Sequence, residues 1–219
     1  DPLDWGRTST LPKAKKSQKS QLLNSERPLD GRVGVVTGAG SGLGRAISLF
    51  MIEAGATVVG LDVDREALDA TSAGQPPGCY LPVYCDVTDE ESVEKAFESA
   101  AASTAGIDYL VNAAGIAPAY PLEDFPLDAW QKTLDINLTG YFLCAREAVR
   151  LLKKQGRGGS IVNITSKSGL EASKSNSAYN ATKAGEIHLM RGWAMELGGD
   201  GIRVNCVAPG NVFKGSKIW

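Results

Sequence analysis

The sequence contains little of what metal-binding, disulfide-rich or membrane proteins depend on. It has one histidine, and its four cysteines are scattered without a C-x-x-C pair, so the composition points away from a metal site and a disulfide framework. No apolar run approaches the roughly 20 residues that cross a bilayer. The net charge of −2 gives the chain no general attraction to nucleic acid or to an anionic membrane. We therefore expect a cytoplasmic protein with reduced thiols and no metal ion.

Residues 1–30 lack the apolar periodicity of a folded domain. They are polar, and Lys13, Lys15, Lys16 and Lys19 cluster among serine and glutamine. We expect an arm or linker here, because too little apolar surface is present to build a core. A nucleic-acid-binding arm is the alternative, with only these lysines in its favour. Residues 31–219 have enough apolar side chains for one sizeable core and are expected to form a single domain.

Glycine, in contrast, is abundant where an apolar strand gives way to a helix. Five glycines fall between Gly34 and Gly44, and their spacing fits T-G-x-x-x-G-x-G rather than G-x-G-x-x-G. Glycines let a phosphate approach the backbone, and the helix start adds N–H groups and the positive end of its dipole. A pyrophosphate site is therefore predicted, with a merely flexible loop as the alternative. Its residues are Thr37, Gly38, Gly40, Ser41, Gly42, Leu43 and Gly44.

Short apolar strands and helices alternate along the rest of the chain. Strands are expected near residues 33–36, 56–61, 79–85, 107–111, 159–165 and 202–207, with helices near residues 46–52, 64–70, 88–102, 126–154 and 177–197. This alternation predicts an α/β fold, a doubly wound parallel sheet of the Rossmann type with helices on both faces. Ligands of such sheets bind at the carboxyl ends of the strands. Asp62 ends the second strand, where it could accept hydrogen bonds from a ribose; taken alone, it is a helix cap or turn residue.

Three polar residues near the fifth strand form a candidate catalytic group. Tyr179 and Lys183 are four residues apart on one expected helix, so they share a face. A phenol with a pKa near 10 is a weak base at neutral pH, and a neighbouring ammonium favours the phenolate. Ser166 follows the fifth strand, where its hydroxyl could donate to a carbonyl oxygen. Taken singly, the two helical residues are a surface pair and the serine is a turn residue.

These residues occur in the order and at the intervals of a known family. The motifs are Thr37-Gly38 with Gly42 and Gly44, Asn112-Ala113-Ala114-Gly115, Asn137, Ser166, Tyr179 with Lys183, and Pro209-Gly210. Over residues 31–219 the sequence resembles the short-chain dehydrogenase/reductase family. The resemblance implies an NAD(P)-dependent oxidoreductase that interconverts a secondary alcohol and a ketone.

The resemblance also implies a role for each motif. Tyr179 would be the general acid/base and Ser166 would hold the substrate oxygen, while Lys183 would lower the pKa of the tyrosine and bind the nicotinamide ribose. Asn137 would support a water relay. The remaining implied cofactor contacts are Asp86 and Val87 at the adenine, Asn112, Ala113, Ala114 and Gly115 along the sheet, and Pro209, Gly210 and Val212. In relatives the helices after Pro126 and Ser177 form the subunit interface, so a homotetramer or homodimer is expected.

Within this family pattern, NAD is predicted over NADP. Asp62 would accept hydrogen bonds from the ribose 2′ and 3′ hydroxyls and would repel a 2′-phosphate. Members that prefer NADP commonly carry a basic residue where Ser41 stands. Arg65 lies close enough in the sequence to favour the alternative.

The end of the sequence departs from the family pattern. Lys214 stands where a threonine usually contacts the cofactor, and residues 211–219 resemble the polyol or sugar-phosphate branch, which includes sorbitol-6-phosphate dehydrogenase and aldolase–dehydrogenase fusions. Lys214 and Lys217 would suit an anionic substrate. The family's substrate lid and last strand do not follow, so we expect a C-terminally truncated domain or a fragment. The alternatives are an NAD-using epimerase or dehydratase on the same fold and a non-catalytic nucleotide-binding domain.

Three further charged or titratable residues lie close to the candidate catalytic group. His188 comes nine residues after Tyr179, which places it on the opposite face of the helix, and it is expected to be structural. Lys167 and Glu171 follow Ser166 on a loop that lines the substrate pocket in this family. They are expected either to contact a polar substrate or to be solvated.

Overall fold

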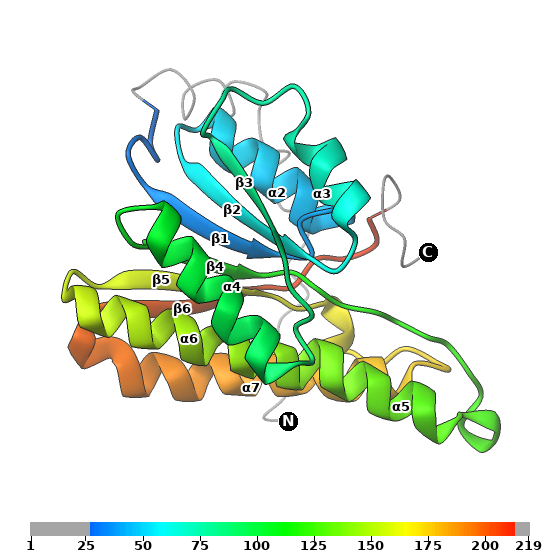
Figure 1. Ribbon diagram of the computed structural model, residues 1–219. Coiled ribbons are helices and arrows are strands. Elements are labelled where there is room, and N and C mark those ends of the chain that lie inside the picture. The colour runs from blue at the N-terminus through cyan, green and yellow to red at the C-terminus, as the bar shows by residue number, and fades with distance from the viewer. Residues whose placement is uncertain (1–26, 213–219) are drawn as a thin grey trace, which may run out of the picture.

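The computed structural model describes residues 27–212, which fold around one parallel sheet of six strands (Figure 1). The strand order is β3-β2-β1-β4-β5-β6. The strands are β1 (Val33–Thr37), β2 (Thr57–Asp62), β3 (Tyr80–Tyr84), β4 (Tyr109–Asn112), β5 (Gly159–Ile164) and β6 (Ile202–Val207). The predictions for residues 1–26 and 213–219, which include most of the N-terminal arm and the roles of Lys214 and Lys217, lie outside the described residues.

Helices cover both faces of this sheet, α2 and α3 on one face and α4, α6 and α7 on the other (Figure 1). The main helices are α2 (Gly42–Glu53), α3 (Arg65–Ser72), α4 (Glu90–Ser103), α5 (Leu127–Leu134), α6 (Gly140–Gln155) and α7 (Ser177–Leu197). Short helical segments are η1 (Leu122–Asp124), η2 (Asp135–Thr139), η3 (Lys167–Gly169) and η4 (Gly198–Asp200). No helix within residues 27–212 is long and apolar enough to cross a membrane.

Successive residues of the central strands are buried in different cores. Val35 packs in the cluster beneath α4 and α6, whereas its neighbour Val36 packs in the cluster beneath α2 and α3. This burial on both sides explains why the central strands are continuous apolar runs rather than alternating ones. The predicted doubly wound α/β sheet is confirmed.

We predicted that helices cover both faces of the sheet, but the outer strands are only partly buried. In β6, Ile202 and Val204 are buried while Arg203 and Asn205 are exposed. In β3, Pro82 is exposed, and an edge strand tolerates proline because one side of its backbone needs no ladder partner. Full burial on both faces therefore describes the centre of the sheet, where the site is expected, rather than its edges.

The long helical stretch predicted over residues 126–154 contains a π-helical turn. α5 starts after Pro126, η2 continues it as a π-helix, and α6 ends before Gly156, whose φ of +66° terminates the helix. A π turn inserts extra backbone into the helical ladder and is common at functional sites. Here it carries Asn137, which is fully buried.

Candidate active site

The turn after β1 is packed too closely for side chains. Gly38 has a φ of +67°, and a Cβ there would lie 2.9 Å from the Cα of Ala114. A Cβ on Gly44 would collide with the carbonyl oxygen of Gly38. Glycine therefore keeps the turn compact and leaves the start of α2 open to an anion.

Thr37 ties this turn to the segment after β4. Its buried hydroxyl accepts hydrogen bonds from the N–H groups of Ala113 (2.9 Å) and Ala114 (3.1 Å). Asn112, also buried, donates its side-chain amide to Asn163 on β5 (3.1 Å). The hydrogen bonds of Thr37 and Asn112 thus hold together the carboxyl ends of β1, β4 and β5.

The Asp62 carboxylate closes the glycine turn from the end of β2. Its two oxygens accept hydrogen bonds from the N–H groups of Gly40 (2.9 Å) and Asp64 (3.0 Å). A Cβ on Gly40 would lie 3.0 Å from the same carboxylate, so this position also excludes a side chain. Asp62 therefore shapes the turn as well as presenting negative charge.

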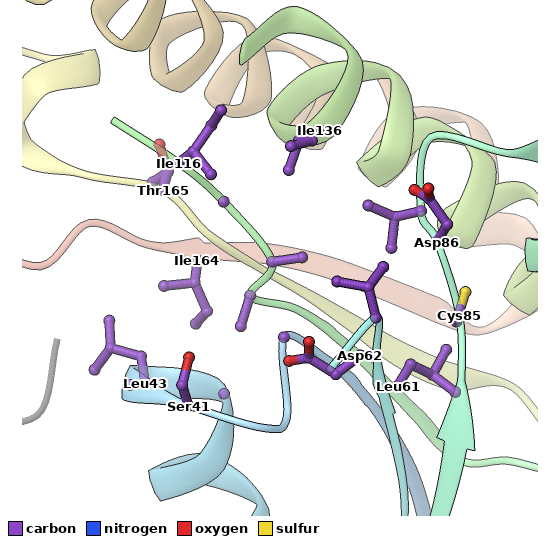
Figure 2. A pocket seen from close by; sticks show the side chains of 18 of the residues that line it. Ser41, Leu43, Leu61, Asp62, Cys85, Asp86, Ile116, Ile136, Ile164 and Thr165 are labelled. Carbon is purple, nitrogen blue, oxygen red and sulfur yellow. The ribbon is translucent and has the colours of Figure 1, made fainter. Parts of the chain in front are cut away.

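A cavity of about 280 Å³ lies along the carboxyl ends of the strands. Figure 2 shows Leu43, Ile116 and Ile164 at one end, and Asp62 and Asp86 toward the other. The predicted cofactor-binding residues that line it are Gly38, Ser41, Gly42, Leu43, Gly44, Asp62, Asp86, Val87, Ala113, Ala114, Gly115, Tyr179 and Lys183. Thr37, Gly40 and Asn112 support its walls rather than line it.

Seven lining residues were missed from the sequence. They are Leu61, Val63, Cys85, Ile116, Ile136, Ile164 and Thr165. Most lie at or just after the ends of strands, so the rule that ligands bind at carboxyl ends could have found them. The exception is Ile136, which reaches the cavity from the π turn.

A second cavity, of about 200 Å³, adjoins the first. The two share Leu43, Thr165 and Tyr179. Its remaining lining is mostly polar: Ser166, Lys167, Ser168, Ser173, Asn176, Pro209, Gly210, Asn211 and Val212. Pro209, Gly210 and Val212, predicted to touch a cofactor, therefore lie at this second cavity. Both Lys167 and Glu171 are exposed, but only Lys167 lines this cavity.

Tyr179 and Ser166 meet where the two cavities join. Both residues are 9% exposed. The Ser166 hydroxyl also accepts a hydrogen bond from the N–H of Ser168 (3.1 Å). Burial raises the pKa of the Tyr179 phenol above its ordinary value; the contact with Ser166 opposes this shift and the charge of Glu186 adds to it. Any lowering of this pKa by the neighbouring ammonium, as expected from the sequence, is therefore smaller than the effect of burial.

The partners of Lys183 also limit its effect on the phenol. Its ammonium donates to both oxygens of Glu186 (2.8 and 3.1 Å), to the carbonyl of Ile164 (3.0 Å) and, at 3.5 Å, to the hydroxyl of Tyr141. It lies 5.5 Å from the centre of the Tyr179 ring. Because an opposite charge touches the ammonium, its field at the phenol is largely offset.

Asn137 joins the π turn to two other parts of the site. Its amide donates to the carbonyl of Ile116 (2.9 Å) and to the hydroxyl of Thr182 (3.2 Å), and its oxygen accepts the N–H of Ile116 (2.9 Å). Gly115 leaves room above this contact, since a Cβ there would lie 3.4 Å from the Asn137 oxygen and 3.8 Å from the Lys183 ammonium. Gly115 and Lys183 therefore line the cavity, and Asn137 lies buried behind Gly115.

Two residues of this cluster, Tyr141 and Glu186, were also missed from the sequence. Glu186 is three positions after Lys183, so helical spacing could have paired them. Tyr141 carried no signal, because the π turn sets the direction in which α6 presents it. His188 is exposed on α7, away from this cluster, as its spacing from Tyr179 predicted.

Comparisons with known proteins find relatives over most of the chain. Residues 32–215 match the family model described as short chain dehydrogenase. The D-threitol dehydrogenase of Mycolicibacterium smegmatis is 39% identical over 195 residues, which are 87% of this chain and 75% of that protein. The uncharacterized oxidoreductase YuxG of Bacillus subtilis is 40% identical over 206 residues, which are 92% of this chain and 30% of YuxG. The crystal structure of 3-ketoacyl-(acyl-carrier-protein) reductase from Brucella melitensis, complexed with NADH, aligns with a TM-score of 0.80 at 27% identity, over 83% of this chain and 76% of that one.

Proposed function

Since the chain belongs to the short-chain dehydrogenase family, we propose that it interconverts a secondary alcohol and a ketone, with Tyr179 as the general acid/base. The observation that carries this proposal is the place of Tyr179 in the wall shared by the two cavities. One cavity would hold a nicotinamide cofactor and the other the substrate. A phenol at their junction can reach an oxygen on the substrate carbon that exchanges the hydride.

The residues of the first cavity fit a dinucleotide. The glycine turn presents backbone N–H groups at a helix start, in a space that a Cβ would fill. Asp62 and Asp86 offer acceptor oxygens toward one end and apolar side chains line the other (Figure 2). When bound, the nicotinamide would accept or supply the hydride.

This chain's own residues would handle the proton and the oxygen. Tyr179 takes the hydroxyl proton in oxidation and returns it in reduction. Ser166, beside it, donates a hydrogen bond to the substrate oxygen. Lys183 would bind the nicotinamide ribose and would stabilise the phenolate to the extent that Glu186 leaves its charge uncompensated. Asn137, buried behind the cavity, would support a water relay to Lys183.

NAD is the proposed cofactor rather than NADP. Asp62 projects from the end of β2, where a negative charge repels a 2′-phosphate. The cationic alternative, Arg65, has its guanidinium 4.3 Å from the centre of the Tyr84 ring, an arrangement that engages it with the aromatic face.

A polyol or sugar is the proposed substrate class. Hydroxyl and amide side chains, such as those of Ser166, Ser173 and Asn176, line the second cavity beside apolar surface, and Lys167 adds one positive charge that would suit a phosphate. The similarity to a D-threitol dehydrogenase favours the same class. A panel of polyols and sugars with and without phosphate, followed by NADH absorbance, would identify it. Cofactor retained through purification without net NADH formation would instead favour an epimerase or dehydratase.

Replacing Tyr179 with phenylalanine tests the proposed mechanism. We expect Tyr179→Phe to lower kcat by about 10³-fold, the usual contribution of a general acid/base, and to leave NADH affinity within twofold. Tyr109→Phe is the matched control, because Tyr109 starts β4 at the opposite end of the strand. Turnover retained in Tyr179→Phe would refute the assignment.

A further inference from the structure

Glu186 is a buried charge that the proposed mechanism does not use. It is 0% exposed on the inner face of α7, and its partner Lys183 is 3% exposed. Removing two charges from water costs several kcal/mol per ion unless the pair is well formed and further hydrogen-bonded. If residue 186 only packed α7 against the sheet, an apolar side chain would do this equally well. The carboxylate therefore calls for another explanation.

The contacts of Lys183 show what the carboxylate does. An ammonium has three protons to donate, and the nearby acceptors are the Glu186 carboxylate, the Ile164 carbonyl and the Tyr141 hydroxyl. Glu186 is the only anion among these acceptors and the nearest of them, at 2.8 Å. It therefore fixes the direction of the lysine side chain and holds the negative charge closest to it.

We propose that Glu186 is a positioning residue that holds the Lys183 ammonium and offsets its charge at Tyr179. This inference rests on the proposed function, in which Tyr179 transfers the proton. The unit that sets the pH range of catalysis is then the Lys183–Glu186 pair rather than the lysine alone.

The groups that face Glu186 determine the sign of its effect. They are Lys183 and Tyr179 on its own helix, Tyr141 on α6, Cys206 on β6 and the hydroxyl of Thr165 after β5. Burial, followed by smaller contributions that include the charge of Glu186, raises the pKa of Tyr141, Tyr179 and Cys206.

Neutralising this carboxylate leaves one uncompensated positive charge beside the phenol. A nearby positive charge favours the phenolate, so removal of the Glu186 charge lowers the pKa of Tyr179. Burial raises the pKa of Glu186 itself, against the effect of Lys183, which brings its own titration toward the neutral range.

The first test is the pH profile of Glu186→Gln, which removes the charge and keeps the shape. We expect the acid limb of kcat/KM to move to lower pH by about one unit. Glu147→Gln is the matched control: Glu147 is a buried carboxylate on α6 that pairs with Arg146 (3.0 Å) and Arg150 (2.8 Å). Its acid limb should not move. An unchanged or upward-shifted limb in Glu186→Gln overturns the proposal.

The second test needs no turnover. Tyrosinate absorbance is titrated in the unmodified protein and in Tyr179→Phe, and the difference isolates Tyr179; the same difference is taken in the Glu186→Gln background. We expect the Tyr179 midpoint to fall when Glu186 is neutral, and equal midpoints would overturn the proposal. If no alcohol is oxidised by the unmodified protein, the proposed function fails while this titration still decides the role of Glu186.

Two further variants separate charge from packing. Glu186→Leu also removes the charge, without leaving a polar group, and predicts the same downward shift if Glu186→Gln does not fold. Glu186→Asp keeps the charge and should keep the acid limb within a few tenths of a unit of the original. A shift in Glu186→Asp as large as that in the neutral variants would assign the effect to packing and refute the proposal.

Discussion

The two ends of the proposed active site are built in opposite ways. At the glycine turn the contacts join backbone to small side chains, as where Asp62 accepts the N–H of Gly40. At the catalytic end Tyr179, Lys183 and Glu186 are 9%, 3% and 0% exposed, and Lys183 and Glu186 contact each other directly. The first end should therefore be sensitive to added volume, and the second to a change of charge.

The largest effect is expected from breaking the buried pair. Lys183→Met leaves Glu186 buried without a cation, which costs about 3 to 5 kcal/mol of stability at neutral pH in addition to turnover. The cost should depend on pH, because burial raises the pKa of Glu186 in the folded protein. Because the pKa is raised, protonated Glu186 favours the folded state. Its contribution to the free energy of unfolding is fully present below the pKa of an unfolded glutamate and is lost as the pH rises through the folded pKa.

Urea unfolding of Lys183→Met at pH 5 and pH 8 measures this dependence. The deficit relative to the unmodified protein should be larger at pH 8. The control is Lys153→Met, which breaks an ion pair with Asp200 (2.8 Å) between half-exposed side chains and should cost at most about 1 kcal/mol. Equal deficits in the two variants would mean that burial does not make the Lys183–Glu186 pair more sensitive to a change of charge than an exposed ion pair.

At the other end, added volume rather than charge should be damaging. Gly44→Ala places a Cβ against the carbonyl oxygen of Gly38, and rigid backbone cannot yield without opening the turn. We expect a loss of about 1 to 3 kcal/mol and at least tenfold weaker NADH binding, measured by fluorescence titration. Gly192→Ala is the control, because apart from the backbone of α7 itself nothing lies within 4 Å of its Cβ position; it should stabilise the helix by about 0.5 to 1 kcal/mol. Undiminished NADH binding in Gly44→Ala would contradict the close-packed turn.

The same contrast explains what the sequence could predict. Strand and helix positions follow from local apolar patterning, so the third strand was expected at residues 79–85 and lies at Tyr80–Tyr84. The glycine turn is equally local, since its geometry depends on which positions lack a Cβ. Residues such as Asp62 and Ser166 could be placed near the site because they follow strands whose carboxyl ends meet.

The electrostatics of the catalytic end could not be predicted in this way. The pKa of Tyr179 depends on burial and on the direction in which the Lys183 ammonium points, and both arise from packing between α6, α7 and β5. Helical spacing places Glu186 on the face of Lys183 but does not say whether that face is solvated. The π turn at Asn137 was missed for a related reason. An apolar pattern predicts a helix but does not show whether its backbone hydrogen bonds are of the α or the π type.

The smallest effect is expected for Asp62, whose side chain combines charge with backbone contacts at the glycine turn. Asp62→Ala removes the carboxylate that would repel a 2′-phosphate, but it also removes the hydrogen bonds to the N–H groups of Gly40 and Asp64. Damage to the turn weakens both cofactors alike, so the informative quantity is the ratio of kcat/KM for NADP to that for NAD. We expect this ratio to rise about tenfold, equivalent to about 1.4 kcal/mol.

Asp89→Ala is the control for this ratio, because Asp89 likewise accepts two backbone N–H groups, from Glu91 (3.0 Å) and Ser92 (3.4 Å), at the start of α4. Its ratio should stay at the value of the unmodified protein. If Asp62→Ala leaves the ratio unchanged, Asp62 acts only as a brace for the turn and cofactor choice lies elsewhere, with Arg65 the next residue to replace. A raised ratio would mean that charge also matters at the glycine end, through this single carboxylate.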